Sequence, residues 1–253
     1  MWGRRRRARR WLDGWEQVAA ERLPQWPLLD DRERARLGEL VRWLVRRKHW
    51  EAARGFELTQ DVVITIAANA ALLVLGLDRD AYRHVRAVVV HPRMFTQHGP
   101  RATTMRGVVT DGPLHLLGQA RDRQGPVMLS WATVRRDVSH PERGQNVVVH
   151  ELAHKLDAAD GLFDGTPEIS DGSERAEWVR VCTSAYRRLR RQDEPDPVLR
   201  SYGEQSPSEF FAVAAEAFLQ RPIDLEAHHP ALYRVLCAFF RQDPAERVRR
   251  ASA

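Results

Sequence analysis

Cysteine is nearly absent from the 253-residue chain, which contains only Cys182 and Cys237. Both residues stand in stretches whose apolar residues recur at helical spacing, so we expect buried thiols. This argues against a disulfide framework and against a cysteine metal site. The cysteine content suits the cytoplasm, which is the expected location.

The chain also lacks a long hydrophobic run. Its basic N-terminus reaches Trp11 and Gly14 without the apolar segment of a signal peptide, so we expect no export. The most apolar run, Val62 to Leu77, is interrupted by Asn69 and is shorter than the roughly 20 residues that a membrane-spanning helix needs. We interpret this run as a core helix.

Lysine is scarce as well, and only two of the 40 basic residues are not arginine. The net charge of +6 is concentrated at the two ends, so we expect a flexible basic arm at 1–15 and a basic tail at 246–253. The arm carries no recognisable nucleic-acid motif, and no nucleic-acid partner is expected. The alternative is charge-driven nucleic-acid binding through Arg4 to Arg10, which would weaken steeply with salt.

The composition is that of a globular protein, with 43% hydrophobic and 29% charged residues, and it argues against a mainly disordered chain. We expect one domain at 16–245, with a helical part at 16–80 and a part with a sheet at 81–245. Apolar periodicity and β-branched runs predict helices at 32–48, 62–77, 145–158, 174–191, 207–219 and 229–241, and strands at 84–90, 106–110 and 126–131. The expected fold class is therefore α+β, with a small sheet and mainly helical N- and C-terminal parts.

One segment, His150-Glu151-Leu152-Ala153-His154, has the spacing of a metal site. Positions i and i+4 of a helix lie on one face, so both imidazoles can reach one cation, as tetrahedral zinc requires. Glu151 is rotated about 100° from His150, too far to bind beside the histidines but able to reach a water at an open coordination position. The pattern predicts one zinc ion per chain, with His150 and His154 as ligands and Glu151 as general base.

The alternative is a chance match on an exposed helix. The residues around the motif are mostly apolar, so the two histidines would be largely buried, where they need partners. The apolar residues are Val147, Val148, Val149, Leu152, Ala153 and Leu156.

A catalytic zinc normally has a third protein ligand, and Glu209 is the candidate. It begins an apolar helix at 207–219, but Ser206-Pro207-Ser208-Glu209 also has the pattern of a helix-capping box. From the residues alone both roles stay open. Glu216, seven residues later, is the other candidate, as a ligand or as a partner of a ligand histidine. Asn146 and Asp157 are further candidates for orienting a histidine, and His228 and His229 are interpreted as a loop pair.

Several blocks together resemble the MtfA (Mlc titration factor A) peptidases of the glutamate-zincin type, over most of the chain. The blocks are Phe56 to Thr59 with Ile66 to Ala68, Gly125 to Trp131, His150 to Asp157, Tyr202-Gly203, and Pro207 to Val213. The resemblance implies a zincin-like metallopeptidase domain at 16–245. It also implies that Glu209 is the third zinc ligand and that Tyr202 is an active-site tyrosine, which stabilises the oxyanion.

These features predict a zinc peptidase that uses an activated water, acts on a peptide or protein and is aminopeptidase-like. The strand at 126–131 would offer an edge to an extended peptide. The resemblance also implies a Mlc-like transcriptional repressor as partner, and with it a regulatory role in sugar uptake. The alternative is therefore a regulatory protein that sequesters a repressor and whose peptidase activity is secondary.

Overall fold

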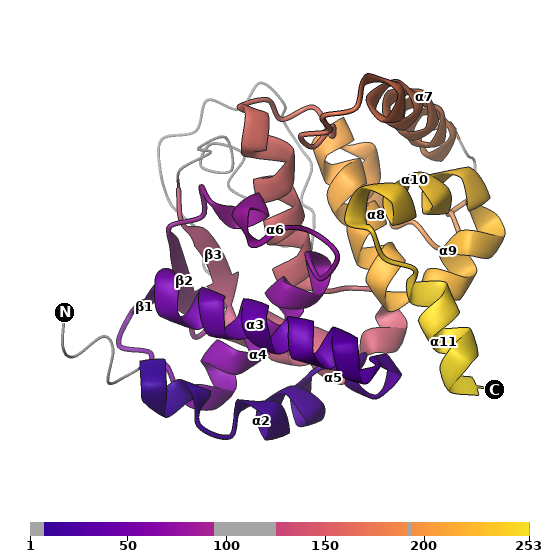
Figure 1. The fold of residues 1–253 in the computed structure, drawn as a ribbon. Helices are drawn as coiled ribbons and strands as arrows, with labels where there is room; N and C mark the ends of the chain where they lie inside the picture. Colours follow the sequence, from indigo (N-terminus) through magenta and orange to yellow (C-terminus); the bar gives the residue numbers. More distant parts are fainter. Residues whose placement is uncertain (1–7, 94–124, 192–193, 253) are drawn as a thin grey trace, which may run out of the picture.

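A small parallel sheet lies at one side of the molecule in the computed structural model, which describes residues 8–93, 125–191 and 194–252 (Figure 1). Its strands are β1 (His49–Ala52), β2 (Ala87–His91) and β3 (Val127–Ser130), in the order β1-β2-β3. In the register, Trp50 pairs with Val88 and Val88 with Val127. The fold class is therefore α+β, as predicted.

The N-terminal helices pack around one buried helix. α2 (Trp15–Arg22) and α3 (Asp31–Arg47) both contact α4 (Gln60–Leu73). Thr59 caps the start of α4, because its hydroxyl accepts a hydrogen bond from the Val62 N–H, and the helix is buried from Val62 to Leu73. The prediction of a core helix in this run is confirmed.

After β3, the described part of the chain is mainly helical. It comprises α5 (Trp131–Ser139), α6 (Val147–Asp157), α7 (Gly172–Leu189), α8 (Pro207–Gln220), α9 (Pro222–His228), α10 (Pro230–Phe240) and α11 (Pro244–Ser252), with 3-10 turns that include η4 (Ala158–Asp160) and η5 (Ser201–Glu204). α6 contacts β3 on one side and α8 on the other, and in Figure 1 it stands between the sheet and the C-terminal helices. The contact between α6 and α8 positions the site.

The predicted helices are found with ends that differ by a few residues. Of the predicted strands, 84–90 is found as β2, 126–131 as β3, and 106–110 lies outside the described residues. Trp131 is the first residue of α5 rather than a strand residue, because the Ser130 hydroxyl caps this helix by accepting a hydrogen bond from the Thr133 N–H. β1 and the helices α2, α5 and α9 were not predicted.

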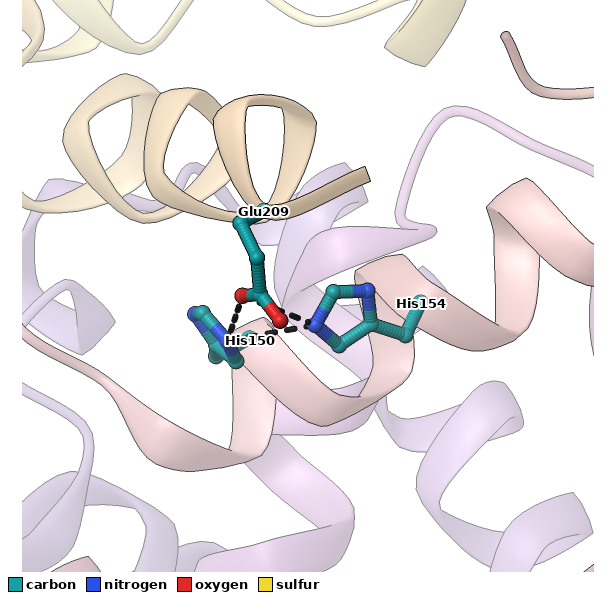
Figure 2. A group of neighbouring side chains, drawn as sticks. All are labelled: His150, His154 and Glu209. Atoms are coloured by element: carbon teal, nitrogen blue, oxygen red, sulfur yellow. Dashed lines mark hydrogen bonds and ion pairs between the residues drawn. The ribbon is translucent and has the colours of Figure 1, made fainter. Parts of the chain in front are cut away.

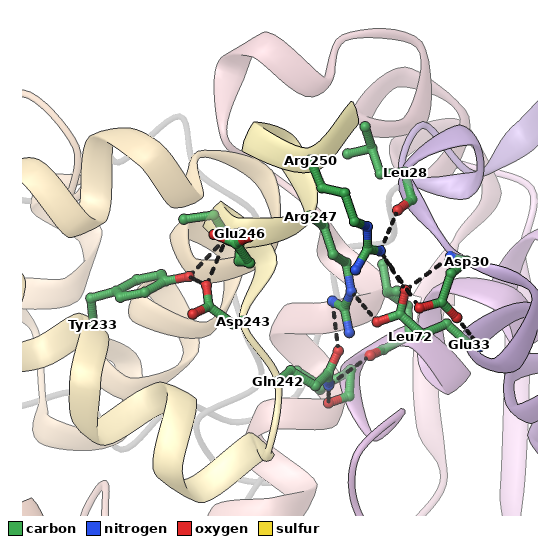
Figure 3. Close-up of polar contacts among 12 residues, drawn as sticks. Leu28, Asp30, Glu33, Leu72, Tyr233, Gln242, Asp243, Glu246, Arg247 and Arg250 are labelled. Carbon is green, nitrogen blue, oxygen red and sulfur yellow. Dashed lines mark hydrogen bonds and ion pairs between the residues drawn. The ribbon is translucent and has the colours of Figure 1, made fainter. Parts of the chain in front are cut away.

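The two basic ends differ from expectation where they are described. Residues 8–12 are helical, and Trp11 is only 4% exposed, because it joins the main hydrophobic core. The predicted tail is the helix α11, in which Arg247 is buried and paired with Glu33 on α3 (Figure 3). Residues 1–7, the first part of the expected arm, lie outside the described part. Over the described ranges, no helix combines the length and the apolarity needed to cross a membrane.

Candidate metal centre

Asn146 fixes the start of α6. Its side chain accepts a hydrogen bond from the Val149 N–H at 3.2 Å and donates to Oδ1 of Asn69, on the buried helix α4, at 2.7 Å. Its backbone N–H donates to Oε1 of Glu216 on α8 at 2.8 Å. The helix that carries the histidine motif is thereby joined to α4 and to α8.

Three buried side chains meet where α6 passes the start of α8 (Figure 2). Nε2 of His150 lies 3.1 Å from Oε2 of Glu209, and Nε2 of His154 lies 3.3 Å from the same oxygen. The two Nε2 atoms are 3.2 Å apart. Among the described residues this is the one cluster of three or more metal-ligating side chains whose donor atoms lie within 4.8 Å of one another.

The spacing of these three atoms fits a metal ion. Two donors that are each about 2.1 Å from a tetrahedral ion lie about 3.4 Å apart, and the observed separations are 3.1 to 3.3 Å. Two imidazoles and one carboxylate also form a donor set that leaves a fourth tetrahedral position open. The cluster therefore has the chemistry and the dimensions of a catalytic metal site.

Each histidine is oriented through its other ring nitrogen. Nδ1 of His150 lies 3.2 Å from Oε2 of Glu216, and Nδ1 of His154 lies 3.0 Å from Oγ of Ser208. Such partners fix the ring orientation of ligand histidines, and here they direct both Nε2 atoms toward Glu209. Glu216 therefore lies beside His150 and outside the cluster of three.

The charges in the cluster stabilise one another. Burial alone would lower the pKa of His150, but the carboxylates of Glu216 and Glu209 raise it to about 10. Burial alone would raise the pKa of Glu209, but hydrogen bonds and charge interactions with His150 and His154 hold it well below its usual value. Without an ion in the cluster, Glu209 is an ionised acceptor held between the two imidazoles.

At the start of α8, the backbone and the side chain of Glu209 make different contacts. The Ser206 hydroxyl accepts a hydrogen bond from the Glu209 N–H at 3.1 Å, so Ser206 is the helix cap expected from the sequence. The Glu209 carboxylate is directed at His150 and His154. The backbone of Glu209 thus takes part in capping while its side chain lies at the cluster.

The two residues expected to act on the substrate lie beside the cluster. Glu151 follows His150 on α6 and is partly buried. Tyr202 lies in η5, and its ring centroid is 5.8 Å from that of His150. Burial raises the pKa of Tyr202, and the charges of Glu209 and Glu151 raise it further, so the phenol stays protonated and can donate a hydrogen bond.

The other candidates have different surroundings. Asp157 accepts a hydrogen bond from the Gly165 N–H at 2.8 Å, and burial raises the pKa of Asp157 to about 7. His228 contacts the Asp224 carbonyl, and His229 contacts Asp196.

Two residues of the site were not identified from the sequence. Ser208 adjoins the candidate Glu209, so the capping pattern could have drawn attention to it. Arg200, which pairs with Glu216, carries no sequence signal.

Comparison with known proteins gives one family and several relatives. The model of a family described as glucose-regulated metallo-peptidase M90 matches residues 1–241. "Mlc titration factor A" of Serratia proteamaculans is 32% identical over 253 residues, covering 94% of each chain. The protein of the same name from Yersinia pestis is 32% identical, covering 95% of this chain and 93% of its own. The "Uncharacterized protein slr2042" of Synechocystis is 31% identical, covering 91% of this chain and 84% of its own.

Proposed function

The chain belongs to the glucose-regulated metallo-peptidase M90 family, and from that premise we propose a zinc peptidase whose ion would be held by His150, His154 and Glu209. The family implies a metal-dependent peptidase and a domain of the zincin-like class. The observation that carries the proposal is the meeting of three buried donor atoms at 3.1 to 3.3 Å. Zinc is the ion for which two imidazoles and one carboxylate are a frequent catalytic donor set.

Glu151 would act as the general base. The ion, when bound, lowers the pKa of a coordinated water and polarises the substrate carbonyl. The Glu151 carboxylate would take a proton from the attacking water and return it to the nitrogen of the leaving amine. Its place on α6, one residue after His150, keeps it within one helical turn of the cluster.

Tyr202 would stabilise the oxyanion that develops on the substrate carbonyl. A donor serves this role only while it keeps its proton, and burial together with the nearby carboxylates raises the pKa of Tyr202. Its ring lies beside His150, at an angle of 53°. A hydrogen bond from its hydroxyl would add to the charge stabilisation that the ion supplies.

The substrate would be a peptide or a protein, bound along β3. Within the described residues this strand pairs on one side only, with β2, and α6 contacts it. An extended peptide could pair with the other edge and lie across the cluster. Aminopeptidase-like cleavage is part of the proposal, and peptides with free and acetylated N-termini would test it.

The test combines metal analysis with hydrolysis. Wild type should carry about one zinc per chain and cleave short chromogenic peptides. Glu151→Gln should keep the ion and lose turnover, whereas Glu209→Gln should lose the ion. Glu174→Gln, a change of the same size on the exposed start of α7, should alter neither property. Equal zinc content in all four proteins, with no cleavage by any, would overturn the proposal.

A second candidate function is the binding of a transcriptional repressor, with a role in sugar uptake. The support for this second function is the name of two relatives, "Mlc titration factor A". This second function would require a cytoplasmic location, and the free thiols of Cys182 and Cys237 are compatible with that location. Binding of a Mlc-like repressor by Glu151→Gln, with wild type cleaving no peptide, would favour this function over the peptidase.

A further inference from the structure

One buried carboxylate joins three segments of the site. Glu216 is 2% exposed, and its Oε1 accepts a hydrogen bond from the Asn146 N–H at 2.8 Å. Its Oε2 contacts both Nδ1 of His150, at 3.2 Å, and the guanidinium of Arg200. Burial alone would raise the pKa of Glu216, but His150, Arg200 and the Asn146 N–H lower it. The group is thus an anion that holds α6, a ligand histidine and the segment before η5 together.

Arg200 lies at the entrance of the turn that carries Tyr202. It is the residue before η5, and its carbonyl accepts a hydrogen bond from the Gly203 N–H at 3.0 Å. The far end of the turn is held separately, because the Tyr186 hydroxyl donates to the Glu204 carbonyl at 3.2 Å. The side chain of Arg200, two residues before Tyr202, therefore holds the start of the turn through its pair with Glu216.

We propose that Arg200 is a positioning residue: its ion pair with Glu216 holds Tyr202 in place relative to His150. The inference deepens the proposed function and rests on the roles given there to these residues. His150 is already placed by α6, by Glu216 and by Glu209. Tyr202 lies on a four-residue turn that packs against α8 and α7, and the pair of Arg200 with Glu216 holds the start of that turn.

A merely structural role for Arg200 predicts something different. If the guanidinium only compensated the buried charge of Glu216, its loss would lower the stability of the fold and would not act through Tyr202. The side chain of Arg200 is 30% exposed and that of Glu216 is 3% exposed, so an uncharged replacement can remain partly solvated. Arg200→Met removes the ion pair with Glu216, and Arg200→Lys keeps the positive charge but lacks the planar guanidinium group.

The first test follows Tyr202 without any need for activity. The chain has four tyrosines, so protein labelled with 3-fluorotyrosine gives four fluorine resonances, and Tyr202→Phe assigns one of them. Arg200→Met should shift or broaden the Tyr202 resonance and leave those of Tyr82 and Tyr233 in place. Arg200→Lys should cause a smaller change. An unchanged Tyr202 resonance in Arg200→Met would overturn the proposal.

Arg22→Met is the matched control. Arg22 is also partly exposed, at 40%, and also pairs with one carboxylate, that of Asp61, at 2.7 Å. This pair joins α2 to the start of α4. The control variant should lose an ion pair and leave all four resonances unchanged. If the Tyr202 resonance moves as far in this variant as in Arg200→Met, the effect is one of general stability, and the proposal fails.

The second test is a double-mutant cycle in the metal-loaded enzyme. Arg200→Met should keep about one zinc per chain and lower kcat about 10- to 100-fold, the range seen for residues that orient site groups, with little change in KM. Combined with Tyr202→Phe it should lower kcat no further, because the residue that it positions is gone. The same fall in both backgrounds would show independent roles and would contradict the proposal.

The two proposals fail in different ways. If neither wild type nor any variant cleaves a peptide, the proposed function is wrong, and the fluorine spectrum still decides whether Arg200 places Tyr202. If wild type cleaves peptides as proposed but kcat is unchanged in Arg200→Met, only the inference about Arg200 is wrong. If Arg200→Met does not fold, Arg200→Lys takes its place in both tests, with the same direction of change expected.

Discussion

The hydroxyl oxygen of Ser208 lies 3.0 Å from Nδ1 of His154. Ser208 directly precedes Glu209, whose carboxylate approaches Nε2 of the same histidine at 3.3 Å. Two neighbouring residues at the start of α8 therefore contact the two nitrogens of one imidazole. The position of this helix end determines both the orientation of His154 and the place of the third donor.

The contact between Ser208 and His154 predicts a defined loss of metal affinity. Ser208→Ala removes the partner of Nδ1, so the ring of His154 is no longer held in the orientation that directs Nε2 toward Glu209. The zinc affinity should fall about 10- to 100-fold, as is common when the partner of a ligand histidine is removed. Competition with a chromogenic chelator measures the change.

The serine at another helix start provides the control. Ser173 lies in the first turn of α7 and donates to the exposed Asp171. Ser173→Ala should leave the zinc affinity unchanged. Equal affinities for Ser208→Ala and wild type would show that Ser208 does not support the ligand.

The parts of the site that could be predicted lie close together in the sequence. His150 and His154 are separated by one helical turn, so their common face follows from helix geometry alone. The role of Glu209 was harder to predict, because the residues around it also fit a helix cap. The resemblance to a known family was needed to favour the role of a metal ligand. In the structure, Ser206 caps the helix while the Glu209 carboxylate lies at the histidines.

The parts that could not be predicted depend on contacts between distant segments. The link from Glu216 to the start of α6 joins residues 70 apart in the chain, and no spacing rule indicates it. The basic C-terminus has the composition of a solvated tail, yet Arg247 pairs with Glu33, 214 residues away. Such pairs become evident only once the packing of the helices is known.

Metal binding should release a proton. In the metal-free protein the pKa of His150 is raised to about 10, so this histidine carries a proton at pH 7. Only the neutral imidazole binds a metal, so zinc displaces the proton, and zinc affinity should rise with pH up to about pH 10. Titration calorimetry in buffers of different ionisation enthalpy should give about one proton released per ion.

Glu216→Gln provides a check on the cause. The charge of Glu216 is the largest of the interactions that raise the pKa of His150. Its removal should lower that pKa and therefore the number of protons released at pH 7. If the variant releases as many protons as wild type, the group that loses the proton is not His150.

Gly165 contacts both the end of α6 and the start of α8, and a side chain at this position should destabilise the fold. It has φ +78°, and an added Cβ would lie 2.4 Å from the carbonyl oxygen of Pro207. Its N–H donates to Asp157, and its carbonyl accepts from the Trp178 indole at 3.0 Å. Gly165→Ala should lower the free energy of unfolding by roughly 3 kcal/mol or more, as strain and overpacking add. Urea denaturation measures it.

Gly55→Ala separates the strain from the clash. Gly55 has a similar φ of +71°, but nothing lies within 4 Å of an added Cβ. This variant should lose only about 1–2 kcal/mol, the cost of the left-handed conformation. Because the clash at Gly165 falls on the first residue of α8, Gly165→Ala should also lower zinc affinity, whereas Gly55→Ala should not. Equal losses of stability in the two variants would contradict the role of the close contact.

The last helix should contribute to stability through Arg247. Its Nε donates to Glu33 on α3 at 2.6 Å, and its Nη1 donates at 3.1 Å to Gln242. Gln242 itself donates to the carbonyls of Leu72 and Leu73, the last two residues of α4 (Figure 3). The side chains of Arg247 and Glu33 are 9% and 21% exposed, so the pair is largely shielded from water. Without Arg247, Glu33 keeps its contacts with Arg250 and with the Asp30 N–H. Arg247→Met should lower the free energy of unfolding by roughly 2–3 kcal/mol, less than the about 3–5 kcal/mol of a fully buried pair.

Arg249→Met is the control for this effect, since Arg249 lies on the same helix and pairs with Glu226 and Glu246 at the surface. Its side chain is 47% exposed, and water replaces such a pair at little cost. The urea midpoint should therefore move clearly for Arg247→Met and hardly at all for Arg249→Met. Zinc affinity should be unchanged in both folded variants, because the main contacts of α11 are with α9 and with the segment after α2. A similar midpoint for the two variants would mean that the C-terminal helix is held by its apolar contacts and not by Arg247.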